Sequence, residues 1–141
     1  MAKPSARVVL NRSRLAALTL SVADGMAEVA RTVLDTADPP DATPFGAGLV
    51  TSGGYLVYVN GQKTAGYGQD GKQPKPPRAA RVSRGSGVAV VTGYGFPGRF
   101  QEFGTVHHAP QPFFTPAVDA VLPHATDIIR SVTGPAVKRI P

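Results

Sequence analysis

At 141 residues the chain is long enough for one domain with a hydrophobic core, and we expect a single domain over residues 1–141. Its 16 glycines and 14 prolines indicate long irregular connections. The absence of cysteine excludes a disulfide framework, a thiolate nucleophile and a sulfur-ligated zinc site.

The formal net charge of +6 is unevenly distributed. Residues 1–14, a basic N-terminal arm, carry four basic and no acidic residues, whereas residues 15–42 carry five acidic residues and one basic residue. A basic segment beside an acidic one suits either nucleic acid or acidic neighbours in an assembly. The N-terminal apolar run is too short for a signal peptide, and no stretch approaches the ~20 apolar residues of a membrane span, so we expect a cytoplasmic protein without a membrane partner.

A helix is predicted over residues 15–37, because apolar residues recur there at spacings of three and four. Ser13 could cap its start, and the pair of prolines at 39–40 must end it. Gly25 either costs about 1 kcal/mol relative to alanine or permits the close approach of a neighbour. The predicted core stripe comprises Leu15, Leu18, Val22, Met26, Val29 and Val33.

Two runs rich in β-branched and aromatic residues, 55–61 and 87–93, predict antiparallel strands paired as a β-hairpin over 55–93. The intervening segment 62–84 is rich in glycine, proline and charge, and we expect it to be a long loop that is mobile in the free subunit and ordered against a partner. Tyr67 is its one large apolar side chain. Its six basic residues are candidates for contact with protein or DNA: Lys63, Lys72, Lys75, Arg78, Arg81 and Arg84.

A last helix is predicted over residues 115–132, with Thr115 as its N-cap and Pro116 at its first position. Pro123 should kink this helix or divide it into two shorter ones. With the first helix and the hairpin, it predicts an α+β fold: an N-terminal amphipathic helix packed on a small antiparallel sheet with a long basic hairpin loop, plus a C-terminal helix.

The segment 98–116 holds four of the six phenylalanines, yet no catalytic set. Phe100 and Phe103 are three residues apart, so one helical turn would place both rings on one inward face, and Gly104 can end that turn in the left-handed conformation. Glu102 would then point elsewhere, either as a solvated carboxylate or as a partner for Arg99 or for a neighbouring subunit. From Val106 to Pro112 the prolines favour an extended arm, which delivers two phenylalanines to the last helix.

The series "VVTGYG … GRFQEFGTVHHAPQPFFTPAVDAV" resembles the neck family of tailed bacteriophages, the small head–tail joining or tail-completion proteins of lambda-like siphophages. In that family a strand ending in glycine leads to an aromatic residue, a glutamate, Phe-Gly-Thr, a Pro-Phe pair and a Pro-Ala pair that opens the last helix. The corresponding residues in this chain are Val90, Val91, Gly93, Phe100, Glu102, Phe103, Gly104, Thr105, Pro112, Phe113, Pro116 and Ala117.

The resemblance implies a structural virion protein that forms a ring, expected to be a hexamer, in the phage neck or tail, assembled in the host cytoplasm. Its partners would be further copies of itself, a head-completion or connector protein, and a tail-terminator or tail-tube protein, with genomic DNA passing through. Candidate interface residues are Arg99, Glu102, Thr105, Pro112, Phe113 and Phe114, and the motif core would comprise Phe100, Phe103, Gly104 and Pro116.

Two other functions are weighed against this one. An enzyme is disfavoured, since there is no nucleophile elbow or phosphate loop, and His107 and His108 would point to opposite faces of an extended arm; we expect no cofactor and no metal. A small basic nucleic-acid-binding protein is the alternative, because the basic loop and N-terminus could neutralise phosphates without reading sequence. The single aromatic residue of that loop gives little support for stacking on bases.

Overall fold

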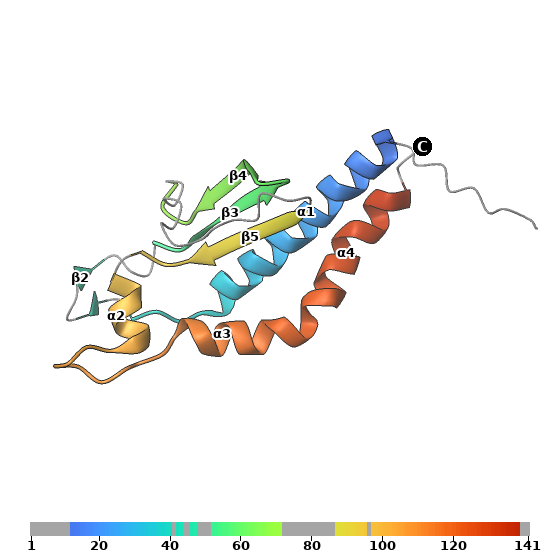
Figure 1. The fold of residues 1–141 in the computed structure, drawn as a ribbon. Helices are drawn as coiled ribbons and strands as arrows, with labels where there is room; N and C mark the ends of the chain where they lie inside the picture. The colour runs from blue at the N-terminus through green and yellow to red at the C-terminus, as the bar shows by residue number, and fades with distance from the viewer. Residues whose placement is uncertain are drawn as a thin grey trace, which may run out of the picture.

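The computed structural model describes residues 12–40, 42–43, 46–47, 52–71, 87–95 and 97–138. Its elements in chain order are α1 (Arg12–Thr36), β1 (Ala42–Thr43), β2 (Gly46–Ala47), β3 (Gly54–Val59), β4 (Gln62–Gly68), β5 (Val88–Gly93), α2 (Pro97–Phe103), α3 (Phe114–Val121), a 3-10 turn (Leu122–His124) and α4 (Ala125–Lys138). The fold is α+β as predicted: an N-terminal helix, a three-stranded antiparallel sheet and C-terminal helices (Figure 1).

The sheet has the order β4-β3-β5, and both neighbours of β3 are antiparallel to it. The predicted pairing of the two apolar runs is therefore confirmed. The expectation that the whole of 62–84 forms a loop is wrong for its first part, because residues 62–68 form β4. Asn60 and Gly61 connect β3 to β4 with φ of 52° and 82°, the left-handed values of a tight type I′ hairpin turn.

Residues 72–84 of the basic loop are outside the described residues. These include five of its six cations: Lys72, Lys75, Arg78, Arg81 and Arg84. Lys63 is exposed on β4. Residues 1–11 of the N-terminal arm are likewise outside the described part of the chain.

Helix α1 is buried on two faces, of which the spacing analysis found one. Alanines and a leucine on the face toward the sheet pack with Tyr55 and Val57 of β3. Val33, on the other face, packs with Ala117 and Val121 of α3, so this part of the predicted stripe does lie in the core. At the N-terminal end the prediction is wrong: Leu15 and Leu18 are 49% and 38% exposed.

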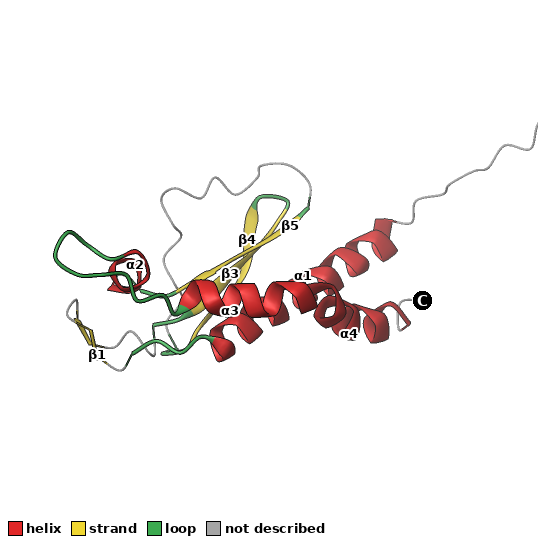
Figure 2. Cartoon of the chain, turned by 90° about the horizontal axis from the view of Figure 1, so that it is seen from below, coloured by secondary structure: helices red, strands yellow, loops and turns green. Residues whose placement is uncertain are grey.

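Gly25 lies where α1 crosses α4. A Cβ added to it would lie 3.1 Å from the Cα and from the Cγ2 of Ile129, which is closer than an ordinary van der Waals contact. Of the two interpretations of this glycine, close approach is therefore the one that the structure supports. Figure 2 shows α4 running beside α1.

The helix ends follow the prolines more closely than the expected caps. Helix α1 ends at Thr36 before the proline pair, as predicted, but Ser13 lies inside the described helix and not before it. The break at Pro123 is confirmed, because a 3-10 turn separates α3 from α4. Helix α4 continues to Lys138, six residues beyond the predicted end. None of the described helices is both long and apolar enough to cross a bilayer.

Candidate functional site

The motif segment folds into helix α2, an exposed arm of residues 104–112, and the start of α3. In Figure 1 the arm extends away from the helices and the sheet. Val106 is 98% exposed, and residues 105–112 are all exposed. The arm is therefore a projection from the body of the protein.

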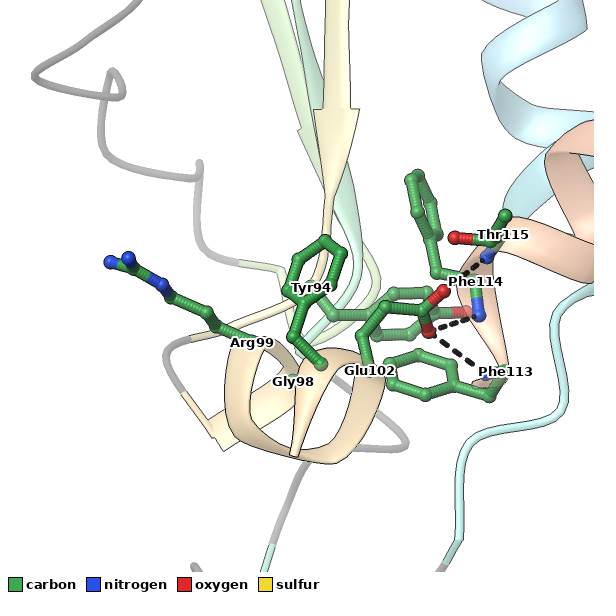
Figure 3. Close-up of a pocket in the computed structure, with 8 residues that line it drawn as sticks. Tyr94, Gly98, Arg99, Glu102, Phe113, Phe114 and Thr115 are labelled. Atoms are coloured by element: carbon green, nitrogen blue, oxygen red, sulfur yellow. Dashed lines mark hydrogen bonds between the residues drawn. The ribbon is translucent and has the colours of Figure 1, made fainter. Parts of the chain in front are cut away.

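Glu102 closes the base of this arm. One carboxylate oxygen accepts hydrogen bonds from the backbone N–H groups of Phe113 and Phe114, both at 2.9 Å, and the other accepts one from the N–H of Thr115 at 2.7 Å (Figure 3). The side chain is 7% exposed. A carboxylate at the start of a helix also interacts favourably with the helix dipole. Glu102 thus caps α3 from a separate element.

The cap accounts for every unpaired N–H group at the start of α3. The first four N–H groups of a helix have no partner within it. With Phe113 at the N-cap, Glu102 binds the first three of these groups, and the fourth position is Pro116, which has no N–H. A glutamate and a proline fourteen residues apart therefore complete one helix end.

This geometry corrects three predictions. Thr115 is not the N-cap, because the helix starts at Phe114 and Phe113 occupies the cap position without a side-chain cap of its own. Pro116 is the third helical residue, where its missing N–H has the same advantage as at the first. Glu102 is neither a solvated carboxylate nor a surface available to a neighbour, because α3 covers it.

Hydrogen bonding sets the charge state of Glu102. Burial on its own would raise the pKa of the carboxyl group, but hydrogen bonds from the Thr115 side chain and from the backbone at Phe114, Phe113 and Thr115 together lower it below the ordinary 4.5. Glu102 is therefore ionised at neutral pH, and its negative charge interacts with the N–H groups at the start of α3. It is not available as a general acid.

Tyr94 joins the motif to the rest of the fold, and the sequence analysis did not identify it. Its ring makes edge contacts with Phe113 and Phe114, with ring centroids 5.1 Å and 6.0 Å away. Its hydroxyl donates to the backbone oxygen of Leu34 at 3.1 Å, near the end of α1. Burial raises the pKa of Tyr94 above its usual value. The sequence feature that could have identified Tyr94 is its position directly after the predicted strand 87–93.

The arm is held in one shape although it is exposed. Gly104 has φ of 74° and donates its N–H to Phe100, so it ends α2 in the left-handed conformation as predicted. A Cβ at this position would lie 2.8 Å from the backbone oxygen of His108, which only glycine tolerates. Thr105 and His108 exchange backbone hydrogen bonds of 2.9 Å and 3.3 Å.

A second pair of hydrogen bonds closes the arm at its base. The N–H of Gln111 donates to the backbone oxygen of Gln101 at 2.9 Å, and the two side-chain amides bond at 2.9 Å. Gln101 is buried, and the sequence analysis assigned it no role. The arm is thus pre-organised at both ends.

The expectation that Phe100 and Phe103 face inward together is wrong. Phe103 is 72% exposed, and Phe100 is half-buried. The inner face of α2 is instead occupied by Gly98, Gln101 and Glu102, which also share one side of a helix at spacings of three and four. The polar side chains take that face because they satisfy the backbone of the arm and of α3.

Two hollows adjoin α2, and Phe113 lines both of them. The apolar hollow, of about 280 Å³, is lined by residues that include Tyr94, Arg99, Phe103 and Phe114. The polar hollow, of about 370 Å³, is lined by residues that include Asp38, Pro40, Gln101, Gln111 and Pro112. Residues 99 and 103 share one side of the helix, whereas residue 101 faces the other side.

The structure separates the predicted interface residues into two groups. Arg99, Thr105 and Pro112 are exposed, whereas Phe113 is 7% exposed and Phe114 is half-buried, so these two rings are packing residues. His107 and His108 are exposed on the arm. Within the described ranges, no group of three or more histidine, aspartate or glutamate side chains could hold a metal ion.

Comparison with known proteins adds no relative to this description. No protein-family model matches the chain, and neither the curated proteins nor the solved structures contain a significant match. The functional argument therefore depends on the residues and their geometry.

Proposed function

We propose that the chain is a structural protein of a tailed-bacteriophage neck or tail, which assembles as a ring at the junction of head and tail. The observation that carries this proposal is the use of Glu102, the central residue of the motif. Both of its carboxylate oxygens accept hydrogen bonds from the backbone at the start of α3, and these bonds fix α3 to the base of the exposed arm. This use of the carboxylate supports a structural role for the motif.

The arm supports an assembly role because it presents an apolar side chain on a rigid support. Val106 is 98% exposed on an arm that is closed at both ends by hydrogen bonds. Rigid segments lose less conformational entropy on docking than flexible ones, so they bind more tightly for the same contacts. We propose that Val106 supplies an apolar contact to another protein of the assembly.

The alternative of nucleic-acid binding receives less support from the described residues. Tyr67, the one aromatic residue of the basic segment, stacks on Tyr55 at 5.3 Å between ring centroids. The guanidinium of Arg31 lies over the same ring, 4.9 Å from its centroid. Since these neighbours occupy the ring, it is poorly placed to stack on a base.

The proposal is tested by joining heads to tails. Tails and DNA-filled heads from a phage that encodes the chain, prepared without it, should join when the purified protein is added. Val106→Asp should fold normally and lower the yield of joined particles severalfold, because it places a charge at an apolar contact. Leu20→Asp, a matched change at another exposed apolar residue (56% exposed), is the control.

Two results would count against a neck role. One is joining that proceeds equally well without the protein. The other is tight binding of the free protein to duplex DNA at physiological salt, which would favour the nucleic-acid alternative. A coding sequence located between a portal or capsid gene and a tail-tube gene would support the neck role.

A further inference from the structure

The two flanks of α2 differ in a way that suits contact between copies of the chain. One flank presents Arg99 and Phe103, four residues apart and therefore on the same side of the helix. Both are exposed, and Figure 3 shows Arg99 directed away from Glu102. A cation and an aromatic ring thus project together from this side.

The other flank presents the complementary features. The polar hollow carries an exposed carboxylate, Asp38, beside Pro40 and Pro112. Proline rings offer apolar surface for an aromatic ring, and the carboxylate offers an acceptor for a guanidinium. The hollow of about 370 Å³ exceeds the ~150 Å³ cavity that holds a benzene ring.

Within one chain, Arg99 and Phe103 line the apolar hollow and do not line the polar one, which contains Asp38. We infer that Phe103 and Arg99 of one copy occupy the polar hollow of a second copy, with the guanidinium of Arg99 paired to the carboxylate of Asp38. The occupant is a second copy because one chain carries both the cation with its ring and the matching carboxylate with its hollow.

The resulting contact is head-to-tail. Each copy uses one flank to bind the next copy and the other flank to receive the previous one, an arrangement that forms a ring when its rotation closes. This inference rests on the proposed function, because it identifies the contact between subunits of the proposed ring. It also explains why Phe103 is left exposed on a helix whose inner face is polar.

The test is a charge exchange measured by sedimentation velocity of the full chain at neutral pH. The wild type should form assemblies of several chains. Arg99→Asp and Asp38→Arg should each sediment as single chains, because each places like charges together, and association should weaken roughly tenfold or more. An equimolar mixture of the two variants should assemble again, since each variant then meets a complementary neighbour.

The mixture separates the inferred contact from effects on folding, because a misfolded variant is not rescued by a second misfolded variant. Asp24→Arg is the matched control: it makes the same charge change at an exposed residue of α1 that does not line the hollow, and it should assemble like the wild type. Phe103→Ser should fold and remain a single chain.

Three results would overturn the inference: a wild type that stays a single chain at the highest concentration reached, single variants that assemble normally, or a mixture that is not rescued. The neck proposal fails separately. Normal assembly of both single variants, together with normal joining of heads to tails, would remove this contact and leave the neck role in place.

Discussion

Glu102 shows how one buried side chain can link two helices. Its carboxylate binds three N–H groups of the following helix, and the proline at the fourth position removes the remaining one. Charge-assisted hydrogen bonds to a helix start are stronger than neutral ones. The residue is therefore a structural requirement of the arm.

Replacing Glu102 by glutamine should lower the free energy of unfolding by about 1–3 kcal/mol, because the charge is lost and one of the two oxygens becomes a donor facing backbone N–H groups. Urea denaturation measures the change. The exposed Asp24→Asn variant is the control and should stay within about 0.5 kcal/mol of the wild type. An unchanged midpoint for Glu102→Gln would contradict the capping role.

The pKa of Glu102 gives a prediction with a defined sign. The folded-state pKa is lower than the ordinary 4.5, so the carboxylate stabilises the fold fully above that value, and the stabilisation is lost as the pH falls through the folded-state pKa. The stability difference between wild type and Glu102→Gln should stay constant from about pH 7 to about pH 5.5 and shrink below that.

Urea denaturation of both proteins over this pH range measures the difference. If the difference did not shrink as the pH fell below about 4.5, the direction of the pKa shift would be wrong. A difference that grew on acidification would argue against the capping hydrogen bonds themselves.

Among the elements, the crossing of α1 and α4 depends on Gly25. A Cβ there would lie 3.1 Å from backbone and side-chain atoms of Ile129, so a larger residue must push the helices apart. Backbone atoms cannot rotate away as a side-chain end can. The close crossing thus explains a glycine inside a long helix.

Gly25→Val should reduce stability by about 1–3 kcal/mol, as overpacking of a helix interface does. Gly134→Ala in α4 is the comparison, since a Cβ there meets nothing within 4 Å. It should raise stability by about 0.5–1 kcal/mol through helix propensity alone. Thermal unfolding of both variants compares them, and a Gly25→Val protein as stable as the wild type would exclude the tight crossing.

The length of α2 explains why the predicted inward face of this helix is wrong. Its spacing allows an aromatic face of Phe100 and Phe103, but the same spacing allows a polar face of Gln101 and Glu102. A helix of two turns has too few positions for the sequence to decide between them. The polar face is inside because unpaired backbone groups of the arm and of α3 need its hydrogen bonds.

Over the whole molecule, one short segment completes two helix ends. Tyr94 donates to Leu34 near the end of α1, and Glu102 caps the start of α3. The aromatic contacts of Tyr94 with Phe113 and Phe114 fill the space between them. The sheet, α1 and the arm are therefore held together at this point.

Tyr94→Phe should cost about 0.5–1.5 kcal/mol, because it removes the hydroxyl donor to Leu34 and keeps the ring contacts. Tyr94→Ala should cost about 3–5 kcal/mol, because the ring is lost as well. Denaturant unfolding measures both. Equal losses for the two variants would show that the ring packing contributes little.

Local signals in the sequence determined the helices, the paired strands and the break at Pro123, because spacing, β-branching and proline act within a few residues. Asn60-Gly61 is a local signal of the same kind: it indicates the hairpin turn that leads into β4, a strand that the sequence analysis did not predict. The tertiary structure alone decided that Glu102 is buried and Phe103 exposed. A buried polar group is stable only with its partners, and those of Glu102 lie more than ten residues away, where local pattern carries no information about them.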